Sequence, residues 1–192
     1  IGGVKRIAKV SEMVVPFMAI IYILFGLIVI FTNVTALPEA FRQIFVGAFN
    51  PRAVAGGAAG SILVAMQMGI ARGIFSNEAG LGSAPIAAAV ASTREPVRQG
   101  LVSMTGTFID TLIVCTMTGL TIIITGSWNI GQEGVGVTIT AFSQGLPGFL
   151  GEAGPAILLV CLIFFAFTTI LGWNFYGERC LEYLVGRNKK AI

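Results

Sequence analysis

Residues 69–85 read GIARGIFSNEAGLGSAP. Four glycines, a proline and the polar cluster SNE at 76–78 lie here within an apolar run from Val54 to Ala91. That run has 38 residues, whereas a helix that crosses a bilayer core needs about 20. A helix that is broken near 75–82 explains both facts, because unwinding frees carbonyls for a cation and amide groups for a carboxylate. Tight packing of a glycine-rich helix is the alternative, but it explains only the glycines.

The composition of the whole chain is that of a membrane protein. Of its 192 residues, 55% are hydrophobic and 11% are charged, and the mean hydropathy is +0.88. A soluble domain has about 25% charged residues, so a soluble enzyme and a disordered tail are excluded. The chain has no histidine, which excludes His–metal sites and Ser–His–Asp triads. We therefore expect neither an enzyme nor a nucleic-acid-binding protein.

Four apolar stretches are long enough to cross the hydrocarbon core as helices. They cover about residues 13–32, 54–91, 101–125 and 155–175. Backbone polar groups in lipid must be paired within their own segment, and these stretches do not alternate as strands do. The sequence predicts an all-α integral membrane protein with four transmembrane helices, the second of them discontinuous. We expect residues 1–192 to be a single membrane domain and a fragment of a longer chain.

Basic residues predict the orientation of these spans. Nine lie on one side of a four-span arrangement and two, Arg42 and Arg52, lie on the other. By the positive-inside rule both ends of the fragment are cytoplasmic, in a multi-pass protein of the plasma (inner) membrane. The nine are Lys5, Arg6, Lys9, Arg94, Arg98, Arg179, Arg187, Lys189 and Lys190.

The two loops on the outer side have their own patterns. Apolar residues at helical spacing in 37–48 predict a short amphipathic helix at the membrane interface. Residues 136–154 alternate apolar patches with Gly145, Pro147 and Gly148. We interpret them as a helical hairpin or a lid that dips toward the bundle, with an ordinary surface loop as the alternative.

Three ionisable residues, Arg72, Glu78 and Asp110, lie within the predicted spans. Each costs roughly 2.5–3.5 kcal/mol near the bilayer centre unless it is paired or hydrated. Arg72 and Glu78 are candidates for gating or structural charges. The simpler alternative is a purely structural role, in which they pair with each other or with helices outside this chain. Asp110 belongs to a polar stripe that suits Na⁺, and a structural pair with Arg72 is its main rival. The other members of that stripe are Ser103, Thr107, Thr111, Thr118 and Thr121, whose hydroxyls could also bond to their own helix.

The fourth span ends in FFAFTTILGWNFYGER. Thr169, Trp173 and Tyr176 fall on one helical face, and Thr168 adds an adjacent hydroxyl. The two aromatic residues could instead belong to an interfacial belt, since Arg179 follows them closely.

Three segments resemble the alanine or glycine:cation symporters, also called sodium:alanine symporters. GIARGIFSNEAGLGSAPIAAA is similar to the signature in the broken sixth helix of that family, and PVRQGLVSMTGTFIDTLIVCTMTGL is similar to its seventh helix. FAFTTILGWNFYGERCLEYLVG is similar to its eighth helix. The resemblance covers the whole chain, which would run from the fifth to the eighth helix of a protein more than twice as long.

The resemblance implies a leucine-transporter-type inverted-repeat fold and Na⁺-coupled symport of alanine or glycine by alternating access. It implies substrate contacts at Phe75, Ser76 and Asn77, together with Thr169 and Trp173. Of these, Trp173 would close a small apolar pocket around a methyl-sized side chain. Thr168 and Thr169 would bind Na⁺. Asp110 enters as a sodium ligand only by its position in the seventh helix, and the segment near Gln144 would match the extracellular lid. The partners implied are the substrate, the lipid bilayer and the missing N-terminal and C-terminal helices, with no organic cofactor.

Two other functions remain open at this point. A cation channel or pore subunit could use Asp110 and the threonines as a conduction stripe. An H⁺-coupled amino acid transporter could use Asp110 or Glu78 to carry the proton.

Overall fold

The computed structural model describes residues 4–49 and 59–186. These ranges form helices joined by short connections, and no strand occurs in them, as expected for an all-α protein. Within these two ranges, three helical segments are long and apolar enough to cross a membrane. They are Lys9–Thr32, Pro96–Thr125 and Phe149–Val185, and they contain the first, third and fourth predicted spans. The second predicted span starts at residues 54–58, which lie outside the described ranges, and continues in a shorter helix.

The first span lies in α1 (Val4–Thr32), which has Pro16 inside it. A 3₁₀ turn, η1 (Val34–Ala36), leads to α2 (Leu37–Phe49), the helix expected from the amphipathic pattern. On the exposed surface of α2, the Arg42 guanidinium donates to Glu39 at 2.8 Å. This hydrogen bond and the adjacent charge lower the pKa of the Glu39 carboxyl.

The glycine-rich region forms three separate helices. These are α4 (Ala59–Phe75), α5 (Glu78–Leu81) and α6 (Ala84–Ala88). Gly82 ends α5 with φ at +75°, a backbone conformation that side chains with a Cβ rarely adopt. Pro85 lies in the first turn of α6, where its missing N–H breaks no helical hydrogen bond.

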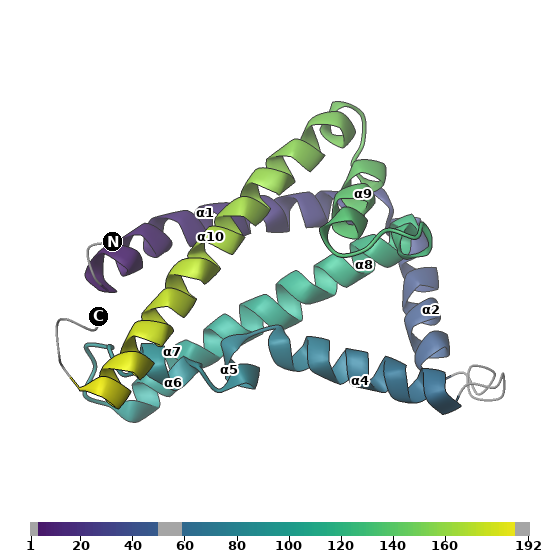
Figure 1. The fold of residues 1–192 in the computed structure, drawn as a ribbon. Coiled ribbons are helices and arrows are strands. Elements are labelled where there is room, and N and C mark those ends of the chain that lie inside the picture. Colours follow the sequence, from purple (N-terminus) through teal and green to yellow (C-terminus); the bar gives the residue numbers. More distant parts are fainter. Residues whose placement is uncertain (1–3, 50–58, 187–192) are drawn as a thin grey trace.

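The third span is a continuous rod of three parts. It consists of α7 (Pro96–Thr107), a π-helical segment η2 (Phe108–Cys115) and α8 (Thr116–Thr125). In Figure 1 the rod runs diagonally in teal, with α5 and α6 beside its α7 end. The turn at Gly126 and a 3₁₀ turn, η3 (Ser127–Asn129), follow it.

The last two helices form a hairpin. The first, α9 (Val135–Gly145), turns at residues 146–148 into α10 (Phe149–Val185). Figure 1 shows α10 crossing α1, with α9 at the end where α8 finishes, and α9 contacts all three of these helices. A core of buried side chains holds this group together: Tyr22, Val29, Phe142, Leu146 and Leu158.

The hairpin is also tied to the end of α1 by hydrogen bonds. The Asn33 side-chain amide donates to the Gly145 carbonyl oxygen at 3.2 Å and to the Val29 carbonyl oxygen at 2.9 Å. Gly145 itself packs so closely on Val29 that a Cβ would lie 2.5 Å from Val29 Cγ1. Residues 136–154 therefore lie against the bundle rather than forming an open loop.

Most of the apolar surface of the three long helices is exposed. Their most hydrophobic windows are only 22%, 17% and 17% buried within the described structure. Soluble proteins rarely expose continuous apolar surfaces of this kind. The surfaces suit lipid or further apolar helices.

Candidate functional site

The interruption between α4 and α5 is built around Asn77. Its side-chain oxygen accepts hydrogen bonds from the backbone N–H groups of Ala79 at 3.0 Å and Gly80 at 3.2 Å, which caps α5. Its side-chain nitrogen donates to Thr111 Oγ1 at 2.7 Å. The Ser76 hydroxyl donates to the Gly73 carbonyl oxygen at 2.9 Å and so gives a partner to one of the carbonyl groups in the last turn of α4. Asn77 thus starts one helix and joins the interruption to the third span.

Gly80 sets how tightly the chain folds back at the interruption. A Cβ placed on Gly80 would lie 2.2 Å from the carbonyl oxygen of Ile74 and 3.0 Å from its Cα. Both are backbone atoms of α4, so the collision cannot be relieved by rotating a side chain. Only glycine allows α5 to approach the end of α4 this closely.

An open cavity of about 760 Å³ lies between this interruption and α7. Candidate residues Ser76, Asn77, Glu78 and Asp110 line it, and the structure therefore brings these four together. The other lining residues are small or neutral: Ala79, Ala84, Ala87, Ala88, Gln99, Gly100, Ser103, Met104, Gly106 and Thr107. Two carboxyl side chains and several neutral oxygen donors give the cavity an acidic character that suits a cation.

One oxygen of Asp110 has no partner in the described part of the chain. Its Oδ2 atom is shielded from solvent and accepts no hydrogen bond there. The ion pairs of the described residues join Glu39 to Arg42 and Arg179 to Glu182, and neither includes Asp110. The expected alternative, a pair between Arg72 and Asp110, is not formed, and Arg72 is exposed on α4. A buried carboxylate oxygen without a partner is costly, and a cation or proton would satisfy it.

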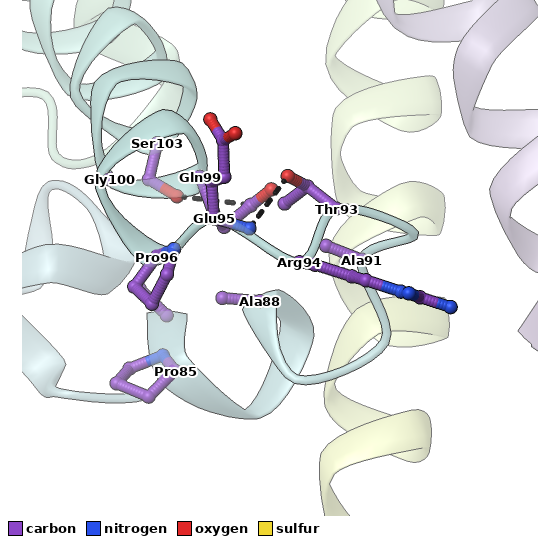
Figure 2. A pocket seen from close by; sticks show the side chains of 11 residues that line it. Pro85, Ala88, Ala91, Thr93, Arg94, Glu95, Pro96, Gln99, Gly100 and Ser103 are labelled. Carbon is purple, nitrogen blue, oxygen red and sulfur yellow. Dashed lines mark hydrogen bonds between the residues drawn. The ribbon is translucent and has the colours of Figure 1, made fainter.

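A second pocket of about 480 Å³ adjoins the first. Figure 2 shows it between α6 and the start of α7, with Gln99 donating to Ser103 and the Glu95 N–H donating to Thr93. Five lining residues are shared by both cavities: Ala84, Ala88, Gln99, Gly100 and Ser103. The cavity at Asp110 therefore continues toward the connection between α6 and α7, where Arg94 extends away from the pocket.

The polar stripe of the third span is divided by the π-helical segment. Ser103, Thr107 and Asp110 line the cavity, whereas Thr118 faces α1 and lies 2.7 Å from the Tyr22 hydroxyl. Thr121 is fully buried within the bundle. A π turn closes i→i+5 rather than i→i+4 hydrogen bonds, and single π turns are frequent at functional sites. The N-terminal part of the stripe therefore lines the cavity, and its C-terminal part, Thr118 and Thr121, packs inside the bundle.

The threonine pair of α10 lies outside this cavity. The Thr168 hydroxyl donates to the carbonyl oxygens of Phe164 at 3.1 Å and Phe165 at 3.0 Å. The Thr169 hydroxyl donates to Phe165 at 2.9 Å. Because each hydroxyl has a single proton, these bonds leave the oxygen lone pairs available as ligands. Thr168 is half-buried and Thr169 is exposed.

The aromatic candidates differ in their surroundings. Phe75, at the end of α4, and Trp173 are both exposed, and neither lines the cavity at Asp110. The Trp173 ring meets the edge of the Tyr176 ring at a centroid distance of 6.3 Å. The structure therefore does not place Phe75 and Trp173 in the cavity that Ser76, Asn77, Glu78 and Asp110 line.

Tyr176 contributes a contact that the sequence does not reveal. It is 7% exposed, and its hydroxyl donates a hydrogen bond to Glu78 Oε2. The sequence places Tyr176 on the same face as Thr169 and Trp173, with a membrane belt as the alternative. That spacing is the only signal for this contact, since the partner lies 98 residues away in the chain.

The chain is similar in sequence to known membrane transport proteins. A sequence model of the "Sodium:alanine symporter family" matches residues 1–192. An "Uncharacterized transporter" of Haemophilus influenzae is 59% identical over 189 residues, which is 97% of this chain and 41% of that protein. The "Sodium/alanine symporter AgcS" of Methanococcus maripaludis is 47% identical over 97% of this chain and 40% of its own length. A "Sodium/proton-dependent alanine carrier protein" of Bacillus sp. is 38% identical over 99% of this chain and 44% of its own.

The chain thus spans about 40% of the length of the curated relatives it matches. The matched family is one of symporters, which agrees with the prediction of a transport protein rather than an enzyme. With its apolar helices, the match also agrees with a multi-pass membrane protein.

Proposed function

Since this chain belongs to the sodium:alanine symporter family, we propose that it is the central part of a sodium-coupled symporter of small neutral amino acids. Alanine or glycine is the substrate and Na⁺ is the co-transported ion. The observation that carries the proposal is the cavity at the helix interruption, where Asp110 Oδ2 has no partner among the described residues.

The interrupted segment is the proposed substrate site. Unpaired amide and carbonyl groups at a helix break recognise the carboxylate and amine of an amino acid. Phe75, Ser76 and Asn77 lie at this break, between the end of α4 and the start of α5, and are the proposed contacts. Thr169 and Trp173 lie outside the cavity in the described structure. We propose that in the complete protein they approach the interruption and close a small pocket, which admits a methyl-sized side chain and excludes larger ones by steric collision.

The proposed sodium ligands are oxygen atoms on two helices. Thr168 and Thr169 present lone pairs because their protons point to their own helix. Asp110 supplies a carboxylate oxygen on the third span. Arg72 and Glu78 act as gating or structural charges on either side of the interruption.

The proposed architecture is a leucine-transporter-type inverted repeat with four transmembrane helices in this chain. Residues 54–91, which include α4, α5 and α6, form the discontinuous second span. Both ends of the chain lie in the cytoplasm, in a plasma membrane. The α9 hairpin near Gln144 forms part of the outer lid. Helices before and after this chain complete the site, and alternating access moves it between the two faces of the membrane.

A second candidate function is coupling to protons. Two observations favour it: Asp110 Oδ2 has no partner in the described chain, and one relative is named a sodium/proton-dependent carrier. Asp110 or Glu78 would then carry the proton.

Uptake of radiolabelled alanine into vesicles that contain the full-length protein tests the assignment. We expect uptake in Na⁺ and little uptake in choline. Thr169→Val removes a proposed sodium ligand, and Asn77→Ala removes the cap of α5 and the bond to Thr111. Each is expected to reduce Na⁺-dependent uptake strongly. If both variants transport alanine with unchanged Na⁺ dependence, the site assignment is wrong.

A further inference from the structure

The start of α5 is attached to two different helices. Asn77 donates to Thr111 on the third span at 2.7 Å, and the next residue, Glu78, accepts from the Tyr176 hydroxyl of α10. These two residues directly follow the end of α4. A movement of the interruption away from α10 would therefore stretch or break the Tyr176–Glu78 hydrogen bond.

Tyr176 is held in place by its surroundings. Its ring contacts the Trp173 ring at 6.3 Å and the Phe175 ring at 5.9 Å, centroid to centroid, and only 7% of the residue is exposed. One turn further along α10, the Arg179 guanidinium lies over the Phe175 ring at 5.2 Å and donates to Glu182. Glu78 is therefore held by a neutral phenol rather than by the nearby guanidinium.

The same helix also carries the proposed sodium ligands. Tyr176 follows Thr169 by seven residues, about 10 Å along the helix axis. The helix from Phe149 to Val185 is continuous, with its proline near the start. A shift of α10 on sodium binding would be transmitted along this rigid rod to the Tyr176 hydroxyl.

We infer that Tyr176 is a positioning residue whose hydroxyl holds Glu78 and thereby couples sodium at α10 to substrate at Ser76 and Asn77. The inference rests on the proposed function and adds a physical route for the coupling. Coupling is the factor by which each ligand raises the affinity for the other, and it is the same in both directions. The Tyr176–Glu78 pair acts on that factor, while the substrate contacts set the affinity itself.

The test measures the alanine Kd of the purified full-length protein by calorimetry, once in saturating Na⁺ and once in choline. The coupling factor is the ratio of the two Kd values. For Tyr176→Phe we expect the coupling factor to fall about tenfold, the effect of one lost hydrogen bond to a charged group. The alanine Kd in choline should stay close to that of the wild type. Tyr183→Phe is the matched control, since Tyr183 lies on the same helix and is 89% exposed.

Variants of the acceptor test the same bond from the other side. Glu78→Gln keeps an oxygen that accepts from the Tyr176 hydroxyl, so it should retain more of the coupling than Glu78→Ala does. Glu78→Ala should lose as much coupling as Tyr176→Phe, and the double variant should lose no more than either single one. Should Tyr176→Phe fail to fold, the difference between Glu78→Gln and Glu78→Ala decides the question.

The outcomes separate this inference from the proposed function. Equal alanine Kd values of the wild type in Na⁺ and choline would refute both. A coupled wild type with an equally coupled Tyr176→Phe variant would overturn the inference alone. Loss of coupling in Glu78→Gln equal to that in Glu78→Ala would also overturn it, because the charge rather than the hydrogen bond would then be responsible.

Discussion

Asn77 combines two roles that are usually given to separate residues. Its oxygen caps α5 and its nitrogen binds Thr111. A cap of this kind contributes about 1 kcal/mol. An unwound segment between two helices would otherwise leave its amide groups to find partners in water. The double contact holds the segment in one conformation beside the cavity.

Removing the partner of Asn77 tests this role without changing the cap. Thr111→Val has nearly the same shape but cannot accept from the Asn77 amide. We expect the apparent alanine affinity to weaken about 2- to 10-fold, the range for one neutral hydrogen bond, measured by alanine binding to the full-length protein. Thr105→Val is the control, because the exposed Thr105 hydroxyl donates to its own helix at Val102. An equal effect of both variants would contradict the role of Thr111.

Gly80 allows a second test at the residue scale. Gly80→Ala forces a Cβ against the backbone of Ile74, so α5 must move away from α4. We expect a lower thermal unfolding midpoint and a loss of most alanine uptake. Gly73→Ala is the control on the same region, since nothing lies within 4 Å of its Cβ position in the described structure. Normal uptake by Gly80→Ala would show that the close approach is not needed.

The sequence predicts which residues form the helix interruption but not which distant residues they contact. The glycines and the SNE cluster predict an interruption at 75–82, and the structure ends α4 at Phe75 and begins α5 at Glu78. The contacts Asn77–Thr111 and Glu78–Tyr176 join residues 34 and 98 positions apart. Such contacts depend on how whole helices pack, and no local pattern encodes them.

At the scale of elements, the third span shows the limit of a periodic pattern. A regular helix with 3.6 residues per turn places Asp110 and Thr118 on similar faces. The structure has a π-helical segment from Phe108 to Cys115, which changes the register between these two residues. Thr118 therefore packs on Tyr22 of α1 while Asp110 lines the cavity. Composition alone does not reveal a π turn, so the stripe looked continuous in the sequence.

The α9 hairpin allows a test of how firmly an outer element is docked. Phe142 is fully buried and its ring lies 5.4 Å from the Tyr22 ring, centroid to centroid. Phe142→Ala leaves a cavity in this core, and we expect a loss of about 3–5 kcal/mol of stability. Thermal unfolding of the purified full-length protein measures the change. Phe149→Ala, at an exposed phenylalanine of α10, is the control, and a midpoint as low as that of Phe142→Ala would contradict the account.

At the scale of the whole molecule, the large exposed apolar surface agrees with the chain matching only part of the length of its relatives. The long helices are mostly exposed in the described structure, and the chain spans about 40% of its matched relatives. Surfaces of this kind suit lipid or further apolar helices. In Figure 1 the start of α1 and the end of α10 lie on the same side, and α2 and α9 lie on the other. That arrangement suits an even number of crossings.

Cysteine labelling tests the proposed orientation. In a full-length protein with its own cysteines replaced by alanine, we would introduce Trp128→Cys or Arg98→Cys. A membrane-impermeant maleimide should label Trp128→Cys in intact cells because that side faces outward. It should label Arg98→Cys only after the membrane is opened, by the positive-inside rule. The reverse pattern would mean that the chain is inserted the other way round.

The central claim is that this chain forms part of a transporter driven by sodium. Concentrative uptake of alanine into proteoliposomes of the full-length protein tests it most directly, with an imposed inward Na⁺ gradient and a protonophore to collapse any pH gradient. The account predicts that internal alanine transiently exceeds the external concentration, and that replacing Na⁺ with choline abolishes this accumulation. Accumulation that persists in choline and follows an imposed pH gradient instead would contradict it.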